Sequence, residues 1–305
     1  MIKSLDFLNE LSLPVIVAPM FLVSGPELVT ACCRSGVVGS FPFPNARKLT
    51  TLDKWLFDIN KNLSGSNVPY AVNLTTHKTY DRLEEELILL KKYKPKIVIT
   101  ALGSPIPVID IVHSYGGFVI ADVNSIELAK KAISAGVDGL ALVSFGAGGH
   151  TGHMNGYSFV SEVRSFYNGF VILAGGISSG ASIRAAQIAG ANCCYMGTSF
   201  IASEESIATT EYKKMITQAT FNDLILSDKL TGANALYLKQ SLLKMGFDLN
   251  NIGSGSGMDL SGSDKKIKAW RDIWSAGHGV GSVKSIESVS TIIDNLKLEY
   301  EVACK

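Results

Sequence analysis

The sequence has no excess of charge of either sign. Its 305 residues include 28 Lys and Arg and 27 Asp and Glu, which gives a formal net charge of +1 at pH 7. Nucleic acids and anionic membrane surfaces attract proteins through clustered positive charge, so the composition favours neither as a partner. We expect a small-molecule substrate, no nucleic acid and no membrane, and the oligomeric state stays open.

Cysteine is scarce, and it is not arranged for disulfides or metal. The five residues are Cys32, Cys33, Cys193, Cys194 and Cys304. They form no C-x-x-C motif and no Cys/His pair at ligand spacing, which argues against a disulfide framework and against a zinc site. We therefore expect no bound metal. Thiols of this kind are typical of reducing compartments and predict a cytoplasmic protein.

Long apolar runs are absent as well. No run reaches the ~20 residues that a membrane-spanning helix needs. The apolar stretch 11–23 resembles the core of a signal peptide, but Asp6 and Glu10 precede it and Pro14 and Pro19 interrupt it. Because a signal peptide has a basic start and an unbroken apolar region, we predict that this stretch contains the first buried strand instead.

Short apolar runs rich in β-branched residues recur along the chain. They cover residues 14–20, 37–42, 70–75, 96–102, 117–123, 139–144, 169–175 and 193–198. Continuous runs of this kind are typical of parallel strands buried on both faces, and helical patterns such as 26–35, 80–93, 125–135 and 180–189 lie between them. Asn124 or Ser125 is expected to cap the third of these helices, and Ser178 or Ser179 the fourth.

The alternation predicts an α/β protein with a closed (β/α)8 fold, the TIM barrel, whose reactive groups follow the carboxyl ends of the strands. An open doubly wound sheet is the second choice. No G-x-G-x-x-G follows the first strand, so a Rossmann dinucleotide site is not supported.

The pattern changes after Phe200. Residues 1–203 are predicted to form the barrel, residues 204–270 a helical insertion on its active face, and residues 271–305 a return to the barrel. Within the insertion we predict helices over 205–220 and 232–245, almost no strand, and a Gly- and Ser-rich loop over 250–263. A final helix over 284–300 is expected to close the barrel.

A glycine-rich loop with one titratable side chain follows the sixth predicted strand. Residues 144–152 read Ser-Phe-Gly-Ala-Gly-Gly-His-Thr-Gly, and the histidine is His150. Glycines let the backbone approach a flat ligand closely, while an imidazole titrates near neutral pH. We predict that His150 is a catalytic base. His153 could support or replace it, and the role of His278 is open.

The strand ends also carry candidate ligands for a cofactor. Gly175 and Gly176 follow the seventh strand, and Gly197 and Thr198 follow the eighth, where β/α barrels commonly bind phosphate. At the ends of the first, third and fifth strands lie Met20, Asn73 and Asp122. Taken singly, these three are as compatible with a core side chain, a turn former and a helix cap, but their shared placement favours binding of a planar ring.

Taken together, these motifs resemble those of the nitronate monooxygenase family, formerly called 2-nitropropane dioxygenases. They are Ala18-Pro-Met20, Val72-Asn73, Gly146-Ala-Gly-Gly-His-Thr-Gly152, Ala174-Gly-Gly-Ile177, Met196-Gly-Thr-Ser-Phe200 and Trp274-Ser-Ala-Gly277. The FMN-dependent enoyl-ACP reductases share the Gly-Gly-His element and the tryptophan segment.

The resemblance implies FMN across the barrel mouth. Pro19, Met20 and Asn73 would touch its ring or ribityl chain, and Gly148 and Gly149 would line its edge. Gly175, Gly176, Gly197 and Thr198 would hold the phosphate. His150 matches the family's catalytic histidine, which removes the proton next to the nitro group. The family then oxidises the nitronate with O2 to a carbonyl compound and nitrite.

Three positions depart from the family pattern. Gly146 stands where many relatives carry Glu, Asn124 lies near the place of a missing lysine, and His278 stands where Gln is frequent. We therefore keep two alternatives to a nitronate-oxidising enzyme. One is an FMN-dependent enoyl-thioester reductase that uses NAD(P)H, and the other is a flavin-binding subunit without turnover of its own.

Overall fold

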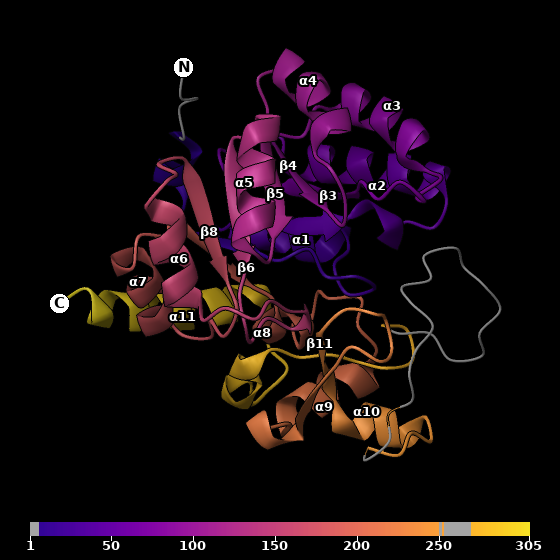
Figure 1. Ribbon diagram of the computed structural model, residues 1–305, viewed down its shortest axis with the longest axis vertical. Helices are drawn as coiled ribbons and strands as arrows, with labels where there is room; N and C mark the ends of the chain where they lie inside the picture. The colour runs from indigo at the N-terminus through magenta and orange to yellow at the C-terminus, as the bar shows by residue number, and fades with distance from the viewer. Residues whose placement is uncertain (1–5, 250–251, 253–269) are drawn as a thin grey trace.

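The computed structural model describes residues 6–249, 252 and 270–305 (Figure 1). Its main sheet has eight parallel strands in the order β1-β9-β8-β6-β5-β4-β3-β2. They are β1 Val15–Val17, β2 Ser40–Pro42, β3 Ala71–Thr75, β4 Ile97–Ala101, β5 Phe118–Val123, β6 Gly139–Val143, β8 Phe170–Ala174 and β9 Cys193–Met196. Each of the predicted apolar runs contains one of these strands, which confirms the eight predicted strands.

The ring of strands closes at Val38. The Val17 amide donates to the Val38 carbonyl at 2.8 Å, and the Val38 amide donates to the Val15 carbonyl at 3.1 Å. This bridge joins β1, the first strand in the order, to the residues just before β2, the last strand in the order. The (β/α)8 barrel predicted from the sequence is therefore confirmed.

Helices cover the outside of the ring. Those of the barrel are α1 Pro26–Arg34, α2 Leu49–Asn62, α3 Leu83–Tyr93, α4 Ile106–Ser114, α5 Ile126–Ala135, α6 Gly156–Arg164, α7 Gly180–Ile188, α8 Thr198–Ile201 and α11 Val289–Ala303. Short 3-10 turns lie at Asp6–Glu10, Phe43–Asn45, Phe221–Asp223 and His278–Ser282. In the described residues, every helix is too short or too polar to cross a membrane.

The barrel has two apolar layers. One lies between the strands and the helices and includes Leu140 and Phe159, which are fully buried. The other fills the inside of the ring and includes Ile16, Ile99 and Ile172. Because alternate residues of a strand point to opposite faces, a continuous apolar run supplies both layers at once.

Local capping decides where two of the helices begin. The Ser125 hydroxyl accepts a hydrogen bond from the Leu128 amide at 3.2 Å, and Gly136 ends α5 with a positive φ of 96°. The Ser179 hydroxyl accepts from the Ser182 amide at 3.1 Å and caps α7. In each pair of cap candidates, the second residue is the cap, because its extended backbone points the hydroxyl at the free amides of the first turn.

The segment after the barrel is not wholly helical. It contains α9 Thr210–Gln218 and α10 Lys239–Lys244, but also β10 Leu224–Ser227 and β11 Ala235–Leu238. These strands pair antiparallel with each other, and β11 also pairs with the two-residue strand β7, Gly149–His150. The prediction of helices over 205–220 and 232–245 with almost no strand was therefore wrong in its second half.

The error has a physical reason. Ala235–Leu238 is a buried apolar run that leads directly into α10, so its residues fit a helical period as well as a strand. Its strand conformation depends on pairing with β10 on one side and with β7, about 85 residues earlier, on the other, and such pairing overrides local preference. The predicted loop 250–263 lies outside the described residues, apart from residue 252. Figure 1 shows α9, α10 and β11 gathered at one end of the barrel.

Closure of the barrel predicts a strong effect of a small substitution. A Cβ at Gly39 would overlap the backbone of Val29 in α1. We expect Gly39→Ala to lower the free energy of unfolding by about 1–3 kcal/mol, because the clash pushes α1 away from the bridge at Val38. Gly281→Ala is the control, since a Cβ there meets open space. Equal unfolding midpoints of both variants in urea would contradict this account.

Candidate active site

The predicted site residues lie at one rim of the barrel. Met20 follows β1, Asn73 lies in β3, Asp122 lies near the end of β5, Gly175 follows β8 and Gly197 follows β9. Parallel strands have their carboxyl ends at the same edge, so residues up to 177 positions apart in sequence are neighbours here: a Cβ at Gly197 would lie 3.3 Å from the Met20 sulfur.

His150 is held in a strand, not in a free loop. His150 and Gly149 pair with Ala235 and Leu236 of β11, and the Thr151 amide donates to the Asn234 carbonyl at 3.0 Å. This pairing ties the glycine-rich loop after β6 to the segment after the barrel. The backbone position of the imidazole is therefore set by main-chain hydrogen bonds.

Side chains from the same segment surround the imidazole. Its Nε2 lies 3.4 Å from the Thr231 hydroxyl, and the Trp270 ring meets it edge-on at a centroid distance of 5.4 Å. Tyr237 in turn stacks on Trp270, also at 5.4 Å. Burial among these groups lowers the pKa of His150 below its usual 6.5, because the charged imidazolium loses hydration. At neutral pH the ring is uncharged and able to accept a proton.

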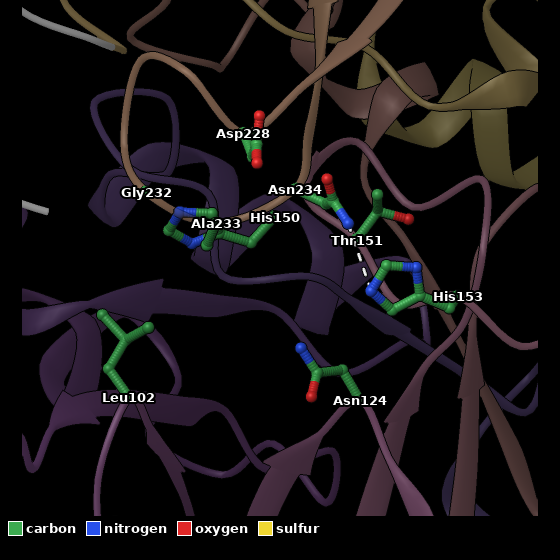
Figure 2. A pocket seen from close by; sticks show the side chains of 9 residues that line it. All are labelled: Leu102, Asn124, His150, Thr151, His153, Asp228, Gly232, Ala233 and Asn234. Atoms are coloured by element: carbon green, nitrogen blue, oxygen red, sulfur yellow. Dashed lines mark hydrogen bonds between the residues drawn. The ribbon is translucent and has the colours of Figure 1, made fainter. Parts of the chain in front are cut away.

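A pocket of about 390 Å³ opens beside His150, as Figure 2 shows. Its lining consists of Leu102, Asn124, His150, Thr151, His153, Asp228, Gly232, Ala233 and Asn234. Most of these side chains are polar, and His153 is fixed by a 3.1 Å contact between its Nε2 and the Asn234 side-chain nitrogen. Leu102, just after β4, has a left-handed φ of 64°, which is unusual for Leu and common near functional sites.

The glycines after β8 form an open cradle. Gly175 and Gly176 have φ values of 121° and 70°, which residues with a side chain rarely adopt. A Cβ at Gly175 would overlap the Ser144 hydroxyl, whereas a Cβ at Gly176 would meet nothing within 4 Å. The Cβ position of Gly176 therefore faces free space at the rim.

The tryptophan segment near the C-terminus locks these loops together. The Gly277 amide donates to the Thr198 hydroxyl at 2.9 Å, and the His278 amide donates to the Gly146 carbonyl at 2.9 Å. A Cβ at Gly146 would lie 2.7 Å from His278 Nδ1. The two departures Gly146 and His278 are thus in contact, and a larger side chain at 146 would displace this histidine.

The other histidines have separate roles. The His278 ring packs edge-on against Phe145 and Phe221, each at 4.9 Å, and does not line the pocket. His77 bonds Thr79 at 2.8 Å, also away from the pocket. His113 Nε2 lies 2.8 Å from the Asp138 carboxylate, at the amino-terminal end of β6. Only His150 and His153 reach the pocket.

Two further candidates lie deeper in the ring. Asn73 is buried, and burial raises the pKa of Asp122 to about 7. Among the described residues, no group of three or more His, Cys, Asp or Glu side chains is arranged to hold a metal ion. The donors at this rim are amides, hydroxyls and a carboxyl, which suit an organic ligand with a heteroaromatic ring and an anionic end.

Comparison with known proteins decides the family. The profile of the nitronate monooxygenase family matches residues 42–299. The chain belongs to the nitronate monooxygenase family. This confirms the resemblance found in the sequence motifs.

Curated relatives include nitronate monooxygenases and a dehydrogenase. The chain is 27% identical to the probable nitronate monooxygenase of Staphylococcus saprophyticus, over 73% of this chain and 74% of that protein. It is 25% identical to the nitronate monooxygenase of Paraburkholderia phytofirmans, over 77% and 76%. It is 26% identical to the (3aS,4S,5R,7aS)-5-hydroxy-7a-methyl-1-oxo-octahydro-1H-indene-4-carboxyl-CoA dehydrogenase of Mycobacterium tuberculosis, over 76% and 64%. The chain spans 39% to 64% of the lengths of the first three curated relatives it matches.

Solved structures share the fold over nearly the whole chain. FabK from Thermotoga maritima has a TM-score of 0.79 at 23% identity, covering 98% of this chain and 96% of that one. Nitroalkane oxidase from Streptomyces ansochromogenes has a TM-score of 0.76 at 22% identity, covering 97% and 98%. At these identities the likeness shows the barrel fold.

Sequence reasoning missed the groups that surround His150. Thr231, Asn234 and Trp270 follow His150 by 81 residues or more, in a segment predicted to be helix and loop. No local pattern marks them, because their role comes from the pairing of β7 with β11. The buried run Ala235–Leu238 was the one available signal.

The surroundings of His150 predict its titration. We expect NMR of labelled histidine to show a pKa below 6.5 for His150, and Trp270→Ala to move it back toward 6.5 because water then reaches the ring. The folded state binds this proton less tightly than the unfolded state, so stability falls as the pH drops through 6.5. His150→Gln should remove the part of this pH-dependent loss of stability that comes from protonation of the imidazole. An unshifted pKa in the wild type would contradict the burial argument.

Proposed function

We propose that this protein is an FMN-dependent oxidoreductase that oxidises alkyl nitronates, and nitroalkanes after deprotonation, with O2 to carbonyl compounds and nitrite. Membership of the nitronate monooxygenase family supports an oxidoreductase with a flavin cofactor. The observation that carries the proposal is the neutral, half-buried His150 fixed by β11 at the edge of a polar pocket.

The rim residues fit FMN. Open space beside the Gly176 backbone suits a terminal phosphate, because backbone N–H groups bind such anions well. Gly175, Gly197 and Thr198 would complete that phosphate site, while Pro19, Met20 and Asn73 would contact the ring or ribityl chain. Gly148 and Gly149 would lie at its edge. When bound, FMN supplies the electron transfer between nitronate and O2.

His150 would act on the substrate by proton transfer. A nitro group acidifies the neighbouring C–H, and a neutral imidazole can remove that proton. Thr231, 3.4 Å from Nε2, can stabilise the imidazolium that forms by accepting its N–H. Asn124 and His153, on the same pocket wall, offer hydrogen bonds to the oxygens of a nitro group or nitronate. A preformed nitronate needs these hydrogen bonds but does not need the removal of a proton.

The enoyl-thioester reductase remains the second candidate, supported by the likeness to a CoA-thioester dehydrogenase. The pocket favours the first candidate, because the Asn, His and Thr side chains of its lining offer hydrogen bonds that suit a small polar substrate better than an acyl chain. Activity assays distinguish the three candidate functions. A nitronate oxidase consumes O2 without nicotinamide, a reductase needs NAD(P)H and an enoyl thioester, and a flavin-binding subunit shows flavin colour with neither activity.

His150→Ala tests the role of the base. The variant should keep bound flavin and most activity with a preformed nitronate, but lose roughly 10²–10⁴-fold in rate with the neutral nitroalkane, the usual worth of a general base. Oxygen consumption with each substrate measures both rates. His77→Ala, outside the pocket, is the control. Equal losses on both substrates would move His150 to a binding role.

Gly176→Ala tests the phosphate cradle. The new methyl group meets no protein atom, so the protein should fold with a backbone cost of about 1 kcal/mol, but the methyl group occupies the space proposed for phosphate. We expect FMN affinity to fall by about tenfold or more, a loss of about 1.4 kcal/mol. Gly116→Ala is a matched control, because its φ of 77° and open surroundings are similar and it lies at the opposite end of the barrel. Similar affinities of the two variants would exclude this cradle.

A further inference from the structure

Two polar side chains face each other inside the barrel. Asp122 lies in β5 and Tyr195 in β9, and these strands are separated in the sheet by β6 and β8. The two side chains lie close enough for each to affect the pKa of the other, although their oxygens form no hydrogen bond of normal geometry. Groups on strands so far apart along the ring can meet only through its interior. Tyr195 indeed packs with the apolar residues that fill the ring.

Both groups end at atoms without a protein partner. Asp122 Oδ1 and the Tyr195 hydroxyl are buried, and neither forms a hydrogen bond of normal geometry with the residues that the structure describes. Buried polar atoms are nearly always hydrogen-bonded in folded proteins, because leaving one unpaired is costly. The pair therefore has hydrogen-bonding capacity available for a ligand.

The location of the pair points to the rim. Asp122 precedes the pocket residue Asn124 by two positions, and Tyr195 precedes Gly197 by two positions. Tyr195 is 6% exposed, whereas Asp122 as a whole is half-buried, so its carboxyl spans the boundary between the apolar interior and the mouth. A ligand that covers the mouth would come within reach of Asp122 first.

The surroundings favour the neutral carboxyl at mildly acidic pH. Burial raises the pKa of Asp122 to about 7, and the Tyr195 hydroxyl only partly opposes this. Within the described residues it has no ion pair with Lys or Arg. The neighbours in register with the pair on β6 and β8, Ala141 and Ala174, do not titrate, and Cys193 acts on Tyr195 from the same strand. A neutral carboxyl has an O–H to donate.

We propose that Asp122, in its protonated form, and Tyr195 are hydrogen-bonding ligands of the flavin ring. This inference rests on the FMN site proposed above. The heteroaromatic edge of a flavin offers carbonyl and ring-nitrogen acceptors, and a protonated carboxyl beside a phenol presents two donors from the interior of the barrel. The pair would thereby add ring contacts to the phosphate contacts of the glycine cradle.

The test measures FMN binding to the apoprotein by quenching of flavin fluorescence, without turnover. We expect Tyr195→Phe and Asp122→Ala each to weaken FMN binding by about tenfold, the usual worth of a hydrogen bond to a ligand. Asp122→Asn keeps a donor and should bind FMN within about threefold of wild type near pH 6. Tyr115→Phe and Asp138→Asn are controls, because their side chains bond backbone at the amino-terminal end of the barrel.

The pH dependence provides a second readout. Between about pH 6 and about pH 8.5, wild type should lose about tenfold in affinity relative to Asp122→Asn, because only wild type loses the donated proton. The ratio of the two affinities cancels titration of the FMN phosphate. Thermal unfolding of each apoprotein shows whether the variants fold.

The outcomes separate this inference from the proposed function. If wild type binds FMN and the Tyr195 and Asp122 variants bind as tightly as their controls, the pair is not a flavin ligand and the proposed function stands. The same holds if the variants only lower the unfolding temperature, or if the affinity ratio is independent of pH. If wild type does not bind FMN at all, both proposals fail.

Discussion

The site depends on the closure of the barrel. Two backbone hydrogen bonds between β1 and Val38 complete the ring, and they remove the open edges that an eight-stranded sheet would otherwise expose. Closure also sets the geometry of the rim, because every parallel strand then delivers its carboxyl end to the same circle. Met20, Asn73 and Gly175 are neighbours for this reason alone. A flat sheet with the same strands would spread them along one edge.

A second constraint acts on the glycine-rich loop after β6. Its glycines permit a tight path but also leave the backbone without a preferred shape. Pairing of Gly149 and His150 with β11 removes that freedom, and Trp270, on which Tyr237 stacks, covers one side of the imidazole. The same contacts fix the ring and lower its pKa. Position and basicity of His150 therefore have a common origin.

Polarity changes along the inside of the barrel. Its lower part is filled by apolar side chains such as Ile16 and Ile172, whereas Asn73, Asp122 and Tyr195 lie toward the rim. An apolar interior excludes water from below, so each polar group near the mouth is forced to find partners above or beside it. The tryptophan segment adds cover from the other side through Gly277 and His278.

Much of this arrangement could be predicted from the sequence alone. The continuous apolar runs determine the eight strands, because residues buried on both faces cannot alternate with polar ones, and the caps at Ser125 and Ser179 follow from local backbone chemistry. The ends of those strands then place the glycines, Asn73 and His150 at one rim. The motifs at these places were also sufficient to indicate the family.

The tertiary structure decided what the sequence left open. Ala235–Leu238 pairs with β10 and also with His150, and no local preference encodes the second partner, which lies 85 residues earlier. The contact between Gly146 and His278, and the meeting of Asp122 with Tyr195 across the ring, arise in the same way. Local sequence determines where a chain extends or turns, whereas contacts between distant segments, stabilised by burial, determine which side chains share one environment and hence their chemistry.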